Sequence, residues 1–401
     1  MKKFGPGFLV TAAFIGPGTV ATASSAGAHY GFALLWAIAF SLIATLVLQE
    51  MAARLGLVTG AGLSESLRNT FKGPVVGRLI IALVVIAIGI GNAAYEAGNI
   101  AGAVMGIQSV VAVSKPVCAL AFGFLAAVLL GIGSYKTIEP ILVTLVLMMS
   151  AVFLLTIMMI EIDYGALVQG LFSPSMPKGS SLTVIALIGT TVVPYNLFLH
   201  ANAVREKWPA KVPVDIAIKE SRRDTCLSVG IGGLVTLAVM STAAVAFFQT
   251  GTAFTPTSLA IQLEPLLGVS AKICFALGLT AAGLTSAITA PLAAAYAVCG
   301  ALGWPQSYSD WHFRAVWISV LSIGVIFASV GTQPLAAIIF AQAANGLLLP
   351  IVATVLLVLM NREEILGNYR NRLASNIVGG LVVSVAIGLG FYKLMSLVAV
   401  I

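Results

Sequence analysis

The sequence predicts an all-α integral membrane protein with eleven transmembrane helices. Composition, the spacing of apolar segments and the distribution of basic residues all support this fold class. Of 401 residues, 59% are hydrophobic and 9% are charged, and the mean hydropathy is +1.05. A water-soluble fold of this size could not hide so much apolar surface, because it would lack the polar groups needed to cover it. The composition therefore excludes a soluble enzyme, a disordered protein and a nucleic-acid binder.

Eleven apolar segments are each long enough to cross a bilayer, which takes about 20 residues in a helix. The connections between them are short, and 54–78, 161–181 and 204–226 are among the longest. The predicted helices lie near residues 8–27, 31–53, 79–105, 113–133, 140–160, 182–203, 227–249, 272–302, 315–331, 335–360 and 374–396.

The basic residues give this arrangement an orientation. With the N-terminus in the cytoplasm, 17 of the 21 Lys and Arg residues fall in inside segments, and the outside segments hold only Lys115, Lys178, Lys272 and Lys393. Cytoplasmic loops carry such an excess, and one missed helix would invert every later loop. We therefore expect a plasma (inner) membrane protein of a prokaryote, with its N-terminus in the cytoplasm and its C-terminus outside.

Two of the predicted helices contain an interruption. The first carries Gly16-Pro17-Gly18 in mid-membrane, where the proline lacks a backbone donor and the glycines permit non-helical dihedral angles. The sixth carries Pro194 in an apolar segment, beside the polar side chains of Thr190 and Asn196. Interrupted helices at matching positions of two inverted halves mark the substrate site of many secondary transporters.

These positions predict an inverted repeat. The first and sixth helices each open a set of five, and an odd number of spans turns the second set upside down. We expect the first repeat in 1–160 and the second in 161–360, with an additional transmembrane helix in 361–401.

Several segments resemble the NRAMP (natural resistance-associated macrophage protein) family, specifically its divergent branch related to magnesium transporters. The similarity covers nearly the whole chain and follows the family's order. It rests on Gly5-Pro6-Gly7-Phe8, Ile15-Gly16-Pro17-Gly18-Thr19, residues 48–60, Val193-Pro194-Tyr195-Asn196 with His200, Gln342 with Leu349-Pro350, and residues 361–367. The resemblance implies the LeuT-type fold, a 5+5 inverted repeat with broken helices 1 and 6.

The departures from the family pattern affect the metal site. The family's metal-binding Asp, Asn and Met fall on Gly16, Thr19 and Val193, and its His after Met-Pro falls on Tyr195. An Asp of the third helix is replaced by Ala93. A Met thioether favours transition metals, so Val193 removes a soft ligand.

Magnesium fits the remaining groups because it dehydrates reluctantly and keeps several waters. Gly16 leaves room for a hydrated ion, and neutral oxygen atoms could contact its waters. We predict a secondary transporter of divalent cations, hydrated Mg²⁺ and also Mn²⁺, that works by alternating access without proton coupling. The predicted ion-binding residues are Gly16, Thr19, Thr190, Val192, Val193, Tyr195, Asn196 and Gln342, and the positions that the resemblance assigns to the metal are Gly16, Thr19, Val193 and Gln342.

Two titratable residues remain at membrane depth, Glu96 and His200. Such residues attract cations or relay protons in transporters. Glu96 could equally be a carboxyl group hydrogen-bonded between helices, and His200 a donor in helix packing.

Two other functions stay open. A site of Thr, Tyr, Asn and glycine backbone also suits a small organic solute such as an amino acid. A receptor or scaffold that has lost transport is a further alternative. We expect no enzyme, no cofactor, no nucleic acid and no obligatory protein partner, so the partners are the lipid bilayer and a divalent metal ion.

Overall fold

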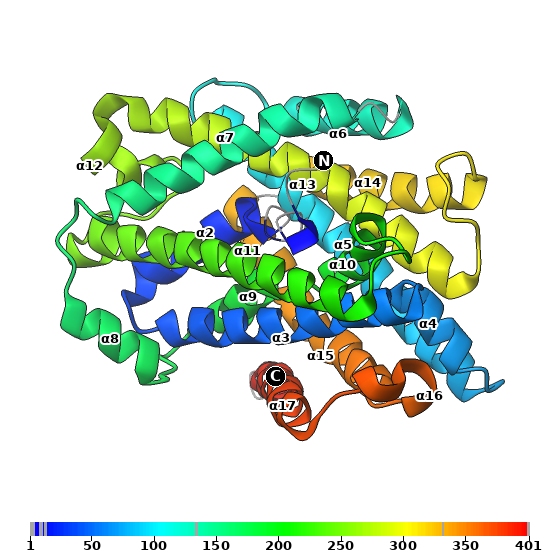
Figure 1. The fold of residues 1–401 in the computed structure, drawn as a ribbon. Helices are drawn as coiled ribbons and strands as arrows, with labels where there is room; N and C mark the ends of the chain where they lie inside the picture. The colour runs from blue at the N-terminus through cyan, green and yellow to red at the C-terminus, as the bar shows by residue number, and fades with distance from the viewer. Residues whose placement is uncertain (1–4, 8–10, 12–13, 133–134, 331–332, 399–401) are drawn as a thin grey trace.

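The computed structural model describes residues 5–7, 11, 14–132, 135–330 and 333–398. Every regular element in these ranges is a helix, which agrees with the all-α prediction. Most of the long helices run roughly along one direction and form a bundle (Figure 1). One end of the bundle carries α4 (Leu63–Thr70) and α16 (Glu363–Leu366), and the opposite end carries α8 (Tyr164–Phe172) and α12 (Glu264–Leu267). We refer to them as the α4 end and the α8 end.

The long helices correspond to the predicted spans. They are α2 (Pro17–Tyr30), α3 (Leu35–Thr59), α5 (Val76–Gln108), α6 (Lys115–Ile132), α7 (Tyr135–Thr156), α9 (Ser181–Thr191) with α10 (Pro194–Lys207), α11 (Val214–Ala243) with the π-helix η1 (Ala244–Gln249), α13 (Ala271–Leu302), α14 (Trp311–Val330), α15 (Pro334–Met360) and α17 (Leu373–Val398).

Nine helical segments within the described ranges are long and apolar enough to cross a membrane, and α7 contributes a shorter apolar stretch at Leu142–Thr156. Helix α2 covers the second half of the predicted first span. The first half includes residues 8–10 and 12–13, which lie outside the described residues. The arrangement is consistent with eleven spans.

The connections predicted at 54–78, 161–181 and 204–226 contain helix that the hydropathy pattern did not indicate. In the first, Glu65 accepts a hydrogen bond from the Gly62 N–H at 2.8 Å and so caps the start of α4. In the second, the Asp163 side chain caps α8 through the Ala166 N–H at 2.9 Å. In the third, α11 begins at Val214 rather than near 227.

Helix α5 packs closely against α13 and α14 through small residues. A Cβ built on Gly283 would lie 2.6 Å from the Ala103 backbone N, and one on Gly324 would lie 2.4 Å from Glu96 Cγ. Small residues let membrane helices approach until their backbones touch, which gains van der Waals contact. This packing holds α5 in a fixed position beside the two interrupted helices.

Candidate functional site

The first interruption lies between Ile15 and Pro17. The Ile15 N–H donates to the Thr11 carbonyl directly before the break. Gly16 then has an extended backbone (φ −118°, ψ −172°) and caps α2, with Pro17 in its first turn. Proline suits this position because its missing N–H would have no partner there in any case.

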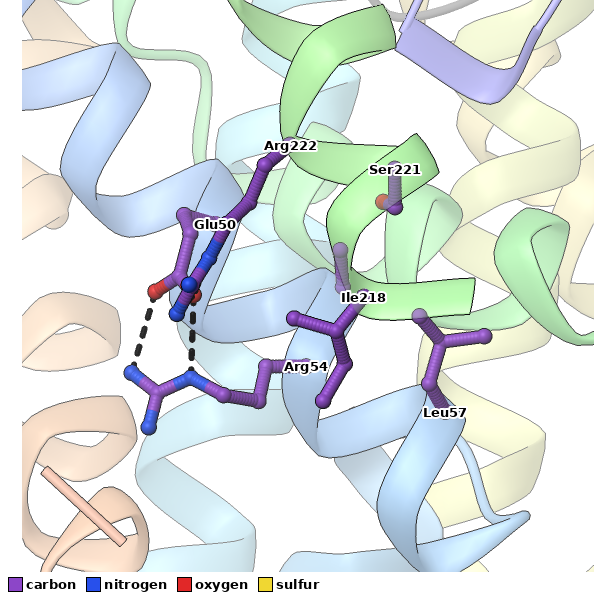
Figure 2. Close-up of a pocket in the computed structure, with 7 residues that line it drawn as sticks. Glu50, Arg54, Leu57, Ile218, Ser221 and Arg222 are labelled. Atoms are coloured by element: carbon purple, nitrogen blue, oxygen red, sulfur yellow. Dashed lines mark hydrogen bonds and ion pairs between the residues drawn. The ribbon is translucent and has the colours of Figure 1, made fainter. Parts of the chain in front are cut away.

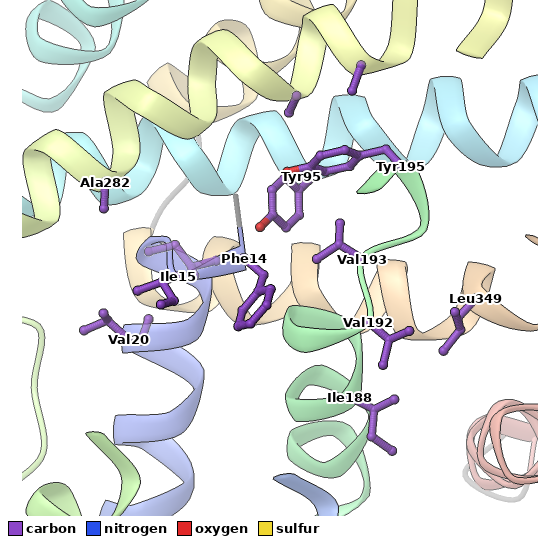
Figure 3. Close-up of a cluster of buried hydrophobic side chains, with 14 of the residues drawn as sticks. Phe14, Ile15, Val20, Tyr95, Ile188, Val192, Val193, Tyr195, Ala282 and Leu349 are labelled. Carbon is purple, nitrogen blue, oxygen red and sulfur yellow. The ribbon is translucent and has the colours of Figure 1, made fainter. Parts of the chain in front are cut away.

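The second interruption has the same construction. Helix α9 ends at Thr191, and Val193 has an extended backbone (φ −82°, ψ 118°) as the N-cap of α10. Pro194 again occupies the first turn of the new helix. The side chains of Phe14 from the first interruption and Val193 from the second lie between α2 and α9, whereas those of Ile15 and Val192 point away from this space (Figure 3). The structure therefore brings together the two breaks that the sequence placed 170 or more residues apart.

Hydroxyl groups connect the two breaks directly. Thr19 Oγ1 and Thr190 Oγ1 lie 2.9 Å apart. Thr19 donates its only hydroxyl hydrogen to the Phe14 carbonyl, so Thr190 is the donor in the bond between the two threonines. Both side chains are at most 1% exposed. Two of the predicted ion-binding residues thus meet at the junction of the half-helices.

Gln342 of α15 reaches the same place. A Cβ on Gly18 would lie 2.2 Å from Gln342 Nε2, and one on Gly189 would lie 1.9 Å from the Gln342 backbone oxygen. Neither amide atom of the buried Gln342 side chain has a hydrogen-bond partner among the described residues. Buried polar groups are normally paired, so an unpaired amide beside two broken helices indicates a group that contacts a ligand or water.

Tyr195 and Asn196 extend this polar surface at the start of α10. Both side chains are fully buried, and the Asn196 amide and the Tyr195 hydroxyl lack partners within the described part of the chain. The Tyr195 ring meets Tyr95 of α5 edge to face, with the ring centroids 5.4 Å apart. Tyr95 was not singled out in the sequence, because nothing in its local pattern distinguishes it from a core aromatic residue.

Val192 and Val193 can offer an ion only their backbone groups. Val192 and Val193 are at most 1% exposed and their side chains are apolar (Figure 3). They occupy the segment between α9 and α10, where the last carbonyl groups of α9 have no helical partner. Such carbonyl groups carry partial negative charge and favour a cation.

Glu96 and His200 lie apart from this junction. Glu96 is fully buried and faces α14 at Gly324, and its Oε2 accepts a hydrogen bond from Asn99 at 3.1 Å. Its neighbour Tyr95 faces Tyr195, because consecutive helical residues point about 100° apart. His200 Nδ1 pairs with Gln49 Oε1 of α3 at 2.9 Å.

The described residues contain no group of three or more His, Cys, Asp and Glu side chains that could hold a metal ion. Among the residues whose side-chain burial the structure describes, Glu96 is the one buried residue that bears a carboxyl group. The junction of the breaks is therefore lined by hydroxyl, amide and backbone groups without formal charge.

Sequence comparison relates the chain to divalent metal transporters of bacteria. The chain is 29% identical over 403 residues to the divalent metal cation transporter MntH of Yersinia pestis, with 99% of this chain and 95% of the relative covered. It is 27% identical over 406 residues to MntH of Aeromonas hydrophila, covering 99% and 96% of the two chains.

Structural comparison gives the same fold. A mutant of the manganese transporter of Eremococcus coleocola superposes with a TM-score of 0.76 at 19% identity, over 98% of this chain and 86% of that one. MhsT in complex with L-phenylalanine has a TM-score of 0.63 at 14% identity, over 96% and 98%. The fold is therefore the LeuT-type arrangement that the resemblance implied.

A sequence profile described as "Natural resistance-associated macrophage protein-like" matches residues 7–396, almost the whole chain. The chain belongs to this Nramp family of membrane transporters and is not an enzyme.

Proposed function

We propose that this chain carries divalent cations across the membrane, with hydrated Mg²⁺ as the preferred cargo and Mn²⁺ as a second one. The class of cargo follows the names of its relatives, which are divalent metal cation and manganese transporters. The preference for Mg²⁺ rests on one observation, the uncharged polar surface at the junction of the two breaks.

Neutral oxygen atoms suit an ion that keeps its water. Mg²⁺ dehydrates reluctantly and retains several waters when it binds, so the protein touches the hydration shell rather than the bare ion. The unpaired amides of Gln342 and Asn196 and the Tyr195 hydroxyl can donate to or accept from those waters. The Thr19–Thr190 bond links the breaks in this closed form, and its opening frees the Thr190 hydroxyl group and an acceptor lone pair of Thr19.

The burial of the junction residues supports transport by alternating access. Thr19, Thr190, Tyr195, Asn196 and Gln342 are each at most 1% exposed, so the junction is closed to both ends of the bundle. A carrier must pass through such a closed form between its two open forms. The α4 end faces the cytoplasm in this proposal, because its loops hold most of the basic residues.

Uptake into proteoliposomes tests the cargo. We expect saturable influx of Mg²⁺ and of Mn²⁺, with Mg²⁺ preferred in direct competition. Gln342→Ala should reduce Mg²⁺ influx by about tenfold, because one supporting polar group is worth about that factor at a metal site. Gln333→Ala is the matched control, since Gln333 is exposed at the start of the same helix. Absence of divalent flux together with flux of a labelled amino acid would replace the proposal by the organic-solute alternative.

Labelling of single cysteines tests the orientation. An impermeant thiol reagent added outside cells should modify Lys178→Cys in the connection that holds α8 and spare Lys211→Cys between α10 and α11. Both residues lie in connections between membrane helices. The reverse labelling pattern would show that the chain is inserted the other way.

A further inference from the structure

One face of α5 carries glycines on either side of a single large side chain. The residues on this face are Gly91, Tyr95, Gly98 and Gly102. They are spaced three or four apart, which aligns them along a helix. A Cβ on Gly98 would lie 3.1 Å from Ala341 Cβ of α15. A Cβ on Gly102 would lie 2.1 Å from Pro17 Cβ. This face therefore lies against α15 and the first interruption, and Tyr95 is the one residue of the four that brings a side chain to it.

The Tyr95 side chain extends from α5 toward the two interruptions (Figure 3). It is fully buried, and its hydroxyl has no hydrogen-bond partner among the described residues. The ring packs against Tyr195 with an angle of 69° between the two ring planes, an edge-to-face contact that fixes its orientation. The phenolic oxygen of Tyr95 is therefore held in place at the junction without a partner from the protein.

Tyr95 lies opposite the polar part of α15. On one side of it along α5, Gly98 packs against the residue that precedes Gln342. On the other side, a Cβ on Gly91 would lie 3.7 Å from Asn345 Oδ1. Gln342 and Asn345 are both at most 2% exposed, and each has an amide nitrogen without a partner in the described part of the chain. Helices α5 and α15 therefore present unpaired polar atoms to one another across the junction.

The hydroxyl group of Tyr95, rather than its ring, requires an explanation. A buried polar atom without a partner costs free energy, and a phenylalanine would keep the ring contact with Tyr195 and avoid that cost. Buried polar atoms are normally paired, so the oxygen indicates a partner that binds from outside the chain. Water bound to an ion supplies one, because it forms hydrogen bonds with a phenolic hydroxyl.

A buried arginine at the α4 end does not oppose this role, because its charge is neutralised. Arg54 of α3 is 5% exposed, and alone it would repel a divalent cation that leaves the junction toward this end. Its Nε and Nη2 each donate to a carboxylate oxygen of Glu50 at 3.0 Å (Figure 2). Arg222 of α11, which is exposed, donates to the same carboxylate at 2.7 Å. The buried charge at the α4 end is thus paired locally, and the contacts at the junction are left to uncharged groups.

We propose that Tyr95 is a specificity-determining residue of this carrier, whose hydroxyl contacts the hydration shell of the cargo from α5 and so favours an ion that keeps its water. The inference rests on the proposed function, because it needs a hydrated cation at the junction. Gln342 contacts the same shell from α15, and Tyr195 holds the Tyr95 ring in place. Without the hydroxyl, the side of the junction formed by α5 would be apolar.

Removal of one oxygen atom tests this role. In proteoliposomes, Tyr95→Phe should raise the KM for Mg²⁺ about three- to tenfold with an unchanged maximal rate, because one hydrogen bond to the bound ion is lost. The KM for Mn²⁺ should rise less, since Mg²⁺ is the ion that dehydrates reluctantly. Tyr369→Phe is the matched control and should leave both KM values unchanged. Its hydroxyl donates to Asp215 Oδ1 at 3.0 Å, in the connection between α15 and α17.

Hexaamminecobalt(III) tests whether the contact is with the shell of the ion. Its ammine ligands do not exchange, and they donate hydrogen bonds as water bound to Mg²⁺ does, so the complex imitates a hydrated cation. We expect it to inhibit Mg²⁺ uptake competitively. Tyr95→Phe should raise its inhibition constant by the same factor as the KM for Mg²⁺, about three- to tenfold. A raised KM with a wild-type inhibition constant would overturn the contact with the shell.

Thermal unfolding in detergent without divalent ions distinguishes this role from a structural one. Tyr95→Phe keeps the ring and removes an unpaired buried hydroxyl, so its midpoint should equal or exceed that of the wild type. A variant that is as stable as the wild type and binds the ion more weakly supports contact with the cargo. A lower midpoint together with an unchanged KM would instead assign the hydroxyl a structural role and overturn the proposal.

Comparison of wild type and variant separates this inference from the proposed function. Absence of Mg²⁺ and Mn²⁺ uptake by the wild type overturns both. Uptake by the wild type with the same KM in Tyr95→Phe overturns the role of Tyr95 and leaves the proposed function in place. Equal rises in the KM for the two ions would overturn the role of Tyr95 in specificity.

Discussion

Gly16 and Val193 are the residues at which this chain departs most from the metal ligands that the resemblance implies. Both are buried at the breaks and neither offers a side-chain ligand. Gly16→Asp combined with Val193→Met supplies a carboxylate and a thioether, and soft ligands select transition metals. We expect the ratio of Mn²⁺ to Mg²⁺ uptake to rise by at least about tenfold. Competition assays in proteoliposomes measure it, with the two single variants as controls, and an unchanged ratio would contradict the assignment of the site.

Gly18 gives a second prediction at this scale. Gly18→Ala places a Cβ 2.2 Å from Gln342 Nε2, so the amide must leave the junction. We expect Mg²⁺ uptake to fall by about tenfold or more, because the amide no longer reaches the hydration shell. Gly89→Ala adds the same methyl group where nothing lies within 4 Å and should transport normally. Equal uptake by the two variants would remove Gln342 from the site.

The sequence points to individual candidate residues of the site but not to their partners, and the role of these residues in ion binding stays a prediction. The interruptions at the prolines point to Thr19, Thr190 and Asn196. Placing a polar side chain inside the membrane costs free energy, so polar residues beside a broken helix indicate a function. The Thr19–Thr190 bond and the approach of Gln342 to Gly18 depend on how α2, α9 and α15 pack, which no local pattern specifies.

At the scale of elements, hydropathy identified the membrane helices and missed the polar ones. Hydropathy reports contact with lipid, so it predicts a loop where α11 extends back to Val214, although the Lys, Glu and Arg residues there favour helix. The starts of α4 and α8 depend on capping by Glu65 and Asp163, a signal that a hydropathy window averages away. The repeat boundaries remain a prediction.

The close packing of α5 on α13 yields a stability prediction. Gly283→Ala drives a Cβ to within 2.6–2.8 Å of Ala103, including its backbone N and Cα, and backbone cannot rotate away as a side chain can. Overpacking of this kind costs about 1–3 kcal/mol. We expect a lower midpoint of thermal unfolding in detergent. Gly388→Ala on α17, whose added Cβ meets nothing within 4 Å, should unfold at the wild-type temperature. Identical midpoints would mean that the two helices are less tightly packed than the structure shows.

At the scale of the whole molecule, transport needs another driving force if no protons move with the ion. The junction is lined by uncharged groups, and Glu96 faces α14 rather than the breaks. A divalent ion that crosses alone moves two charges, so an inside-negative potential contributes about 4.6 kcal/mol per 100 mV. That energy corresponds to accumulation of more than about a thousandfold, since 1.36 kcal/mol is a factor of ten. The potential alone is therefore sufficient for uptake.

Transport that is electrogenic and uncoupled from protons is the expectation that follows. In proteoliposomes with a potassium diffusion potential set by valinomycin, Mg²⁺ influx should increase as the interior becomes more negative, while a trapped pH dye stays constant. Glu96→Gln should keep this behaviour, because its carboxyl group is absent from the junction. Acidification of the lumen in step with metal entry, abolished by Glu96→Gln, would instead assign proton transfer to that carboxyl group and make the chain a proton-coupled carrier.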